Sequence, residues 1–229
     1  MTRPRIGVIS FPGSCDDRDA MRAVELTGAE AVRVWHRDAE PPQLDGALVP
    51  GGFSYGDHLR PGAIARLSPA MDTVRRLAAD GGPVLGICNG FQVLCEADLL
   101  PGVLRPNHGG RFVARDVDLR VQQAGSPWLP GRVVGDILRI PVKHHDGAWT
   151  APDELGDAVE ASGQVLLRYV DNPNGSRGDV AAVTNAEGNV LGLMPHPEHA
   201  VDELLGSTDG RTILHGLRAL AQRRAHALA

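Results

Sequence analysis

Aromatic residues are scarce in this 229-residue sequence and make up only 4% of it. Hydrophobic residues of all kinds account for 42%, so the core must rest on Val, Leu, Ile and Ala. Such aliphatic side chains suit a parallel sheet covered by helices. A chain of this length can bury that core without disulfide bonds or a structural metal. We therefore expect residues 1–229 to form a single domain.

Long apolar runs are also missing. No segment approaches the ~18 consecutive apolar residues that a membrane helix needs, and the N-terminus lacks the pattern of a signal peptide. The three cysteines, Cys15, Cys88 and Cys95, are odd in number and lack metal-ligand spacing. We expect a cytoplasmic protein without a membrane partner, with at least one thiol kept for chemistry.

Positive charge is in deficit, with 23 Lys and Arg against 28 Asp and Glu and a net charge of -5. No basic run or basic stripe is present, which argues against a nucleic-acid partner. The phosphate-binding pattern GxxxxGK[ST] is also absent, so the chain itself shows no ATP site.

Strand and helix patterns alternate in the first half of the chain. This alternation favours a mostly parallel sheet with right-handed crossovers, flanked by helices. After residue 106 more polar strands follow with few helices between them, which indicates an antiparallel extension. The expected strands are 5–10, 31–35, 46–50, 83–87, 112–121, 136–142, 165–169, 180–184 and 190–193. The expected helices lie at 16–27, within 61–79, and at 89–97 and 208–225, with a loop at 126–135.

A nucleophile motif follows the strand at 83–87, where the chain reads Gly-Ile-Cys-Asn-Gly. Glycines two positions on either side of Cys88 relieve the crowding of a sharp strand-to-helix turn, as in a nucleophile elbow. A helix N-terminus there favours a thiolate. The alternative is a buried structural cysteine, but the strand before it favours a nucleophile. We assign Cys95, on the same helix, to the core.

A base and its orienting carboxylate are expected in the run Met-Pro-His-Pro-Glu at 194–198. In an extended segment, residues two apart project to the same side, so His196 and Glu198 can meet. Glu198 can accept a hydrogen bond from one imidazole nitrogen and leave the other free for Cys88. The alternative is a surface turn that carries a histidine by chance. Only this histidine, of nine, combines a strand end, a proline-braced turn and a carboxylate two positions on.

An oxyanion site is expected where Gly51 and Gly52 end the third strand. A carbonyl oxygen that gains negative charge needs two donors, and we nominate the backbone N–H groups of Gly52 and Asn89. A lone pair of glycines would indicate only a flexible turn, but its pairing with an elbow on a neighbouring strand favours a functional site.

At these residues the sequence resembles the class I, triad-type glutamine amidotransferases, which carry PGG, GICNG and PHPE after three strands. The runs FPGS, PGGFSYGDHLRPGAIA, GICNGFQVL, NPNGS and MPHPE resemble, more narrowly, the glutaminase subunits of phosphoribosylformylglycinamidine synthase. The resemblance extends from Ile6 to about Leu217.

The resemblance implies a flavodoxin-like core and a catalytic triad of Cys88, His196 and Glu198, with Gln92 near the glutamine pocket. L-glutamine would acylate Cys88 and release ammonia, and water would then free glutamate. A large synthase subunit that uses ATP and magnesium, together with a small third subunit, would receive the ammonia. That complex would convert formylglycinamide ribonucleotide to formylglycinamidine ribonucleotide in purine biosynthesis. The chain itself would hold no cofactor and no metal.

The sequence departs from this family at three places. Cys15-Asp16-Asp17 stands where Asn-Cys-Asp is usual, so the cysteine is displaced by one position. His144-His145-Asp146-Gly147 replaces His-Gly-Glu-Gly, in a loop expected near the partner interface or the pocket rim. His199 replaces a common arginine. We expect none of these departures to touch the triad.

Two other functions stay open. A cysteine hydrolase or peptidase could use the same elbow on the same kind of sheet. A glutaminase activity that a synthase stimulates would identify a glutamine amidotransferase and exclude a hydrolase or peptidase of this kind. A non-catalytic regulatory module would be recognised by loss of Cys, His or Glu, and all three residues are present.

Overall fold

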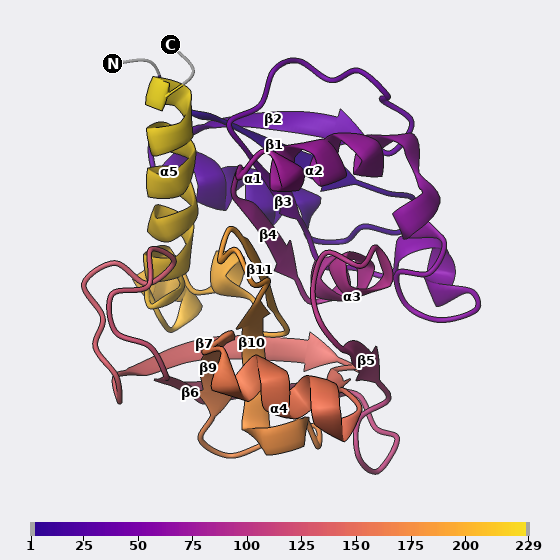
Figure 1. Cartoon of the computed structure of the whole chain (residues 1–229), viewed down its shortest axis with the longest axis vertical. Helices are drawn as coiled ribbons and strands as arrows, with labels where there is room; N and C mark the ends of the chain where they lie inside the picture. The colour runs from indigo at the N-terminus through magenta and orange to yellow at the C-terminus, as the bar shows by residue number, and fades with distance from the viewer. Residues whose placement is uncertain (1–2, 228–229) are drawn as a thin grey trace.

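A mixed nine-stranded sheet organises the computed structural model, which describes residues 3–227 (Figure 1). The strand order is β2-β1-β3-β4-β11-β10-β9-β6-β7, in which the pairings from β2 to β11 are parallel and those from β11 to β7 are antiparallel. The parallel part has the strand order of flavodoxin-like folds. It comprises β1 (Arg5–Ser10), β2 (Glu30–Trp35), β3 (Gly46–Val49), β4 (Val84–Ile87) and β11 (Val190–Leu193). The antiparallel strands are β6 (Val113–Val121), β7 (Ile137–His144), β9 (Val165–Tyr169) and β10 (Val180–Thr184). The predicted α/β fold with an antiparallel extension is confirmed.

Four helices flank the parallel part of the sheet. Helices α1 (Asp17–Leu26) and α5 (Gly210–Ala227) contact each other and pack on β1, whereas α2 (Pro69–Ala79) and α3 (Asn89–Glu96) pack on β3 and β4. Figure 1 shows these helices and the parallel strands toward one end of the molecule, with the antiparallel strands and α4 toward the other.

The burial of the strands explains their sequences. Every residue of β3, β4 and β11 is buried, because helices cover both faces of this part of the sheet. Strands β6 and β7 alternate between buried and more exposed positions instead, as expected for strands with one face toward solvent.

One helix and two short strands after residue 100 are not predicted from the sequence. Helix α4 (Asp153–Ala161) buries only Gly156 and Val159, so its apolar stripe is too narrow for the sequence pattern to predict a helix. Strands β5 (Val103–Arg105) and β8 (Ala148–Thr150) form a separate antiparallel pair of three residues each, too short for a period-two pattern. The loop expected at 126–135 is a loop in the structure.

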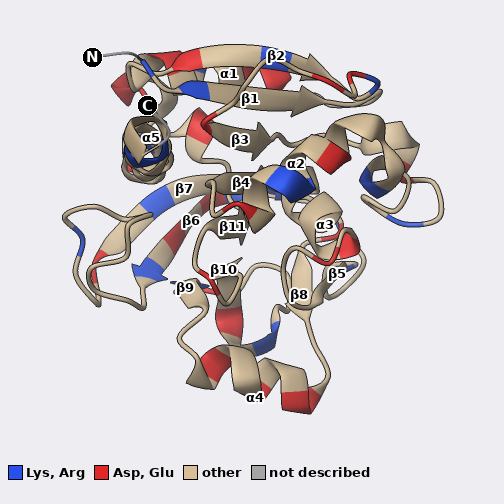
Figure 2. Cartoon of the chain, turned by 45° about the horizontal axis from the view of Figure 1, so that its top comes forward, with Lys and Arg blue, Asp and Glu red and all other residues tan. Residues whose placement is uncertain are grey.

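Charged residues of both signs are interspersed over the elements, and α4 carries acidic residues along its length (Figure 2). Within residues 3–227 no helix is both long and apolar enough to cross a membrane.

Candidate active site

The three sequence motifs meet at one edge of the sheet because they follow three neighbouring parallel strands. Strands β3, β4 and β11 pair side by side, and their carboxyl ends lead into Gly51-Gly52, Cys88 and His196. Cys88, Gly52, Gln92 and His196 line one pocket there. Open α/β sheets bind their ligands at this edge.

Cys88 occupies a strained backbone position between β4 and α3, with φ 52° and ψ -105°. A side chain at Gly90 would overlap the backbone oxygen of Val49, and a Cβ at Gly86 would lie 2.8 Å from the carbonyl group of Gly90. Glycine is therefore required at both positions by the close packing of strand and helix. The chain makes the sharp turn that the motif predicts, and strained residues of this kind cluster at active sites.

His196 and Glu198 form a buried hydrogen bond, with 2.7 Å between Nδ1 and Oε1. The two side chains meet across a 3-10 turn, η4 (Pro197–His199), and not along the extended segment expected from the sequence. Nε2 of His196 has no hydrogen-bond partner within residues 3–227. This nitrogen is therefore free to take a proton from a thiol.

Opposing effects act on the pKa of His196. Burial disfavours the charged ring and lowers the pKa, but the carboxylate of Glu198 and the neighbouring Cys88 outweigh it. The pKa of His196 is consequently raised above its ordinary value of 6.5. The site therefore favours an imidazolium ring.

Gly52 and Asn89, the nominated oxyanion donors, both present backbone near Cys88. Gly52 has φ 149°, and a Cβ there would lie 2.6 Å from the backbone nitrogen of Cys15 and from the carbonyl oxygen of Gly13. Only glycine fits this close crossing of two loops. Asn89 begins α3, so its N–H has no acceptor within the helix. The oxyanion role of the two residues stays a prediction.

Gln92 joins three segments around the pocket. Its Oε1 accepts a hydrogen bond from Nδ2 of Asn89 (2.9 Å), and its Nε2 donates one to the backbone oxygen of Asp146 (2.6 Å). Oδ1 of Asn89 accepts from the backbone N–H of Ser54 at 3.2 Å. These amides fix α3 against the loops on either side of it. The placement of Gln92 near bound glutamine stays a prediction.

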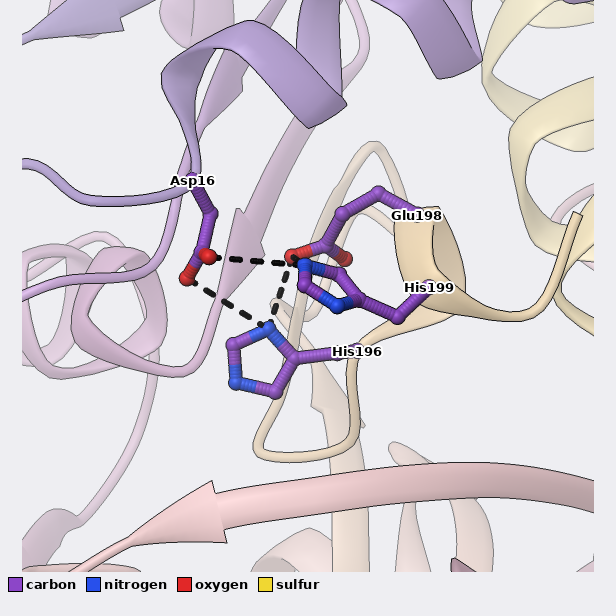
Figure 3. A group of neighbouring side chains, drawn as sticks. All are labelled: Asp16, His196, Glu198 and His199. Carbon is purple, nitrogen blue, oxygen red and sulfur yellow. Dashed lines mark hydrogen bonds and ion pairs between the residues drawn. The ribbon is translucent and has the colours of Figure 1, made fainter. Parts of the chain in front are cut away.

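Two of the family departures touch the predicted triad, so the expectation that they would not is wrong (Figure 3). Oδ2 of Asp16 lies 3.7 Å from Nδ1 of His196. Nε2 of His199 lies 3.4 Å from Oδ1 of Asp16 and 3.6 Å from Oε1 of Glu198. Asp16 is remote from His196 in the sequence, and only the fold brings the loop after β1 to the end of β11. One hint of this contact was present in the sequence, which departs from the family pattern at both Asp16 and His199.

Lys143, at the end of β7, contacts both sides of the site. Its Nζ lies 2.5 Å from Oδ1 of Asp16, and its backbone oxygen accepts a hydrogen bond from Sγ of Cys88 at 3.8 Å. Burial would raise the pKa of Asp16, but His199, His196 and Lys143 together hold it well below its ordinary value. Asp16 is therefore a carboxylate paired with an ammonium group. Sequence reasoning missed Lys143, because a lone lysine in a strand carries no motif.

Asp16, His196, Glu198 and His199 form a cluster in which one ligand atom from each residue lies within 4.8 Å of the others, a spacing that metal sites also show. The ammonium group of Lys143 already neutralises Asp16. The charges of the cluster are thus balanced by protein groups, and its geometry serves the imidazole.

The loop at 144–147 lies at the pocket rim, one of the two places expected for it. The His144 ring is hydrogen-bonded to Oδ1 of Asn107 (3.0 Å), and Nδ2 of Asn174 donates to the backbone oxygen of Gly147 (2.8 Å). Burial and the nearby charge of His196 lower the pKa of His144 to about 4, so this ring is neutral. The NPNGS run, which contains Asn174, therefore holds the loop in place.

The other two thiols differ from Cys88 in their surroundings. Cys95 is buried in the core, as expected, and burial raises its pKa well above the ordinary value. Cys15 is largely exposed at the edge of the pocket, and partial desolvation of its sulfur together with the charge of Asp16 raises its pKa. Neither contacts an imidazole through a hydrogen bond within residues 3–227.

Comparison with known proteins gives one consistent result. A family model described as a CobB/CobQ-like glutamine amidotransferase domain matches residues 3–212. Two relatives are named phosphoribosylformylglycinamidine synthase subunit PurQ. The protein from Rubrobacter xylanophilus is 53% identical over 95% of this chain and 99% of its own length. The protein from Streptomyces coelicolor is 54% identical over 90% of this chain and 92% of its own.

Solved structures agree with this. A chain in the structure of PurLQS from Thermotoga maritima is 41% identical, with a TM-score of 0.87 over 94% of this chain and 98% of that one. A glutamine amidotransferase from Thermotoga maritima, at 15% identity and a TM-score of 0.60 over 98% of this chain and 99% of that one, shares the fold. The chain therefore belongs to the glutamine amidotransferase family, in the branch whose members are named subunit PurQ of phosphoribosylformylglycinamidine synthase.

Proposed function

We propose that the chain hydrolyses L-glutamine through Cys88 and delivers the ammonia to a synthase. The observation that carries this proposal is the buried His196–Glu198 hydrogen bond, which leaves Nε2 of His196 free in the pocket that Cys88 lines. A nucleophile, a base and an orienting carboxylate are the set that acyl transfer requires.

The reaction divides into two acyl transfers. The Cys88 thiolate attacks the side-chain amide carbon of glutamine, and the oxyanion is held by the N–H groups of Gly52 and Asn89. The protonated His196 gives its proton to the leaving nitrogen, so the C–N bond breaks and ammonia departs from a glutamyl thioester. Neutral His196 then takes a proton from water, which attacks the thioester and releases glutamate and the Cys88 sulfur.

The destination of the ammonia is proposed from the relatives. They are named as subunits of phosphoribosylformylglycinamidine synthase, and the Thermotoga maritima structure is titled PurLQS. We propose a large synthase subunit that uses ATP and magnesium, with a small third subunit, making formylglycinamidine ribonucleotide in purine biosynthesis. This chain, one domain around a continuous sheet, would need no cofactor of its own. Three free thiols suit a cytoplasmic location.

The test is glutamine hydrolysis by the wild type and by Cys88→Ala, each with and without the synthase. We expect a partner-stimulated activity that Cys88→Ala abolishes. A glutamine-like electrophile should also label Cys88 before Cys15 or Cys95, as peptide mapping by mass spectrometry would show. Unchanged turnover by Cys88→Ala, or peptidase turnover by the isolated chain, would contradict the proposal.

A further inference from the structure

The run Phe-Ser-Tyr-Gly-Asp at 53–57 has no part in the chemistry described so far, yet its last residue faces the Cys88 pocket. We propose that the carboxylate of Asp57 binds the α-ammonium group of the glutamine whose side-chain amide Cys88 attacks. This inference rests on the proposed function and names the residue that selects an α-amino acid as substrate.

The backbone of this run is held in a strained conformation. Tyr55, Gly56 and Asp57 have φ values of 54°, 66° and 53°, three successive residues in the left-handed region. The hydroxyl group of Tyr55 lies 2.6 Å from Nδ1 of His36 and 2.9 Å from Oγ of Ser68, which anchors the turn. Two non-glycine residues in this region persist only where the surroundings enforce them, as at ligand sites. The strain turns Asp57 into the pocket.

The carboxylate of Asp57 lacks a partner of opposite charge. Its Oδ1 is buried and accepts no hydrogen bond from any residue between 3 and 227. The charged group that acts on it is another acid, Asp146, and burial together with that repulsion raises the pKa of Asp57 to about 6. Asp57 is half-buried, and a carboxylate oxygen that is shielded from water and lacks a partner is costly, so a cation from a ligand would relieve the cost.

The basic groups of the pocket are already engaged elsewhere. Lys143 pairs with Asp16 at 2.5 Å, and Nδ1 of His145 lies 2.9 Å from Oδ2 of Asp146. His196 is committed to Glu198. The protein therefore leaves Asp57 for a cation that arrives from outside. Glutamine brings one, since its amide must reach Cys88 while its α-carbon end stays in the same pocket.

The decisive comparison uses glutamine and 4-carbamoylbutanoate, the same molecule without its amino group. Binding is measured by calorimetry in the full-length Cys88→Ser variant, which cannot turn over, and hydrolysis in the assembled complex with Cys88 intact. Asp57→Asn is the test variant, because asparagine tolerates positive φ. Asp72→Asn, the same change at an exposed site on α2, is the control.

We expect Asp57→Asn to weaken glutamine binding, and to lower kcat/KM for glutamine, by about ten- to one-hundred-fold. The amino-free analogue should change by less than about twofold, so the preference for glutamine collapses. Equal losses for both molecules, or no loss for glutamine, would overturn the proposal for Asp57. Absence of glutaminase activity in the wild-type complex would instead overturn the proposed function itself.

Discussion

Nζ of Lys143 lies 2.5 Å from Oδ1 of Asp16, and this ion pair joins the end of β7 to the loop that follows β1. Through it the antiparallel strands reach the group that flanks His196 on its Nδ1 side. The position of Asp16 beside His196 therefore depends on how the antiparallel strands pack against the parallel part of the sheet.

Removing one member of this pair should cost more than removing both. Lys143→Met removes the ammonium group that pairs with the buried Asp16 carboxylate and leaves that carboxylate to His196 and His199, so we expect a loss of about 1–3 kcal/mol in the free energy of unfolding. In urea denaturation at pH 7, the double variant Asp16→Asn, Lys143→Met should be less destabilised than Lys143→Met alone. Strict additivity would show that the pair contributes nothing.

The same measurement has a defined pH dependence. The pKa of Asp16 is lowered on folding from an ordinary value of 3.8, so the stability that the carboxylate contributes is complete above that pH. It is lost as the pH falls below 3.8 toward the lower folded value. The stability difference between the wild type and Asp16→Asn should therefore be constant from pH 7 to about 5 and shrink in stronger acid.

Glu198→Gln should cripple glutamine hydrolysis while leaving the fold intact. The amide cannot accept the Nδ1–H bond as a carboxylate does, and it no longer stabilises the imidazolium form of His196. We expect kcat of the complex to fall by about 10²- to 10⁴-fold. Because Glu198 raises the pKa of His196, the alkaline limb of the pH–rate profile should also move to lower pH. Glu203→Gln, on an exposed turn, is the matched control, and a wild-type kcat for Glu198→Gln would refute the triad.

Asp57→Asn should stabilise the free protein even as it weakens glutamine binding. The pKa of Asp57 rises from 3.8 to about 6 on folding, so between these values the folded state holds a proton that the unfolded chain has released. Wild-type stability therefore falls as the pH rises through this window. The gain in Tm of Asp57→Asn over the wild type should be absent near pH 3, grow through the window and be complete above pH 6. A lower Tm at pH 8 would show that Asp57 is a structural residue.

The parts of the site that sequence alone predicts are those with local signals. Cys88 stands between two glycines after an apolar strand, and His196 and Glu198 share one short turn. Such patterns report backbone geometry over a few residues, so the elbow and the His–Glu contact could both be anticipated. The turn is 3-10 instead of extended, but His196 lies just before it with a non-helical backbone (φ -105°, ψ 87°), and its ring still meets the carboxylate of Glu198.

Asp16, Lys143 and Asp57 could not be predicted in the same way. Each enters the site through a contact between segments distant in sequence, and an isolated acid or lysine in a loop or strand is usually solvated. For α4 the limit was different, because a helix with two buried residues offers too weak a period to detect. Contacts between segments that are far apart in the sequence bring these residues into the site, and a local sequence pattern carries no information about such contacts.

The position of β11 in the sheet determines when the site can be assembled during synthesis of the chain. This strand is the last of the sheet to be synthesised, yet it lies in the middle, between β4 and β10. The segment that carries Cys88 leaves the ribosome long before the one that carries His196 and Glu198. A nascent chain therefore bears an unassisted thiol beside an open strand edge until β11 inserts, and the same late event closes the core and supplies the base.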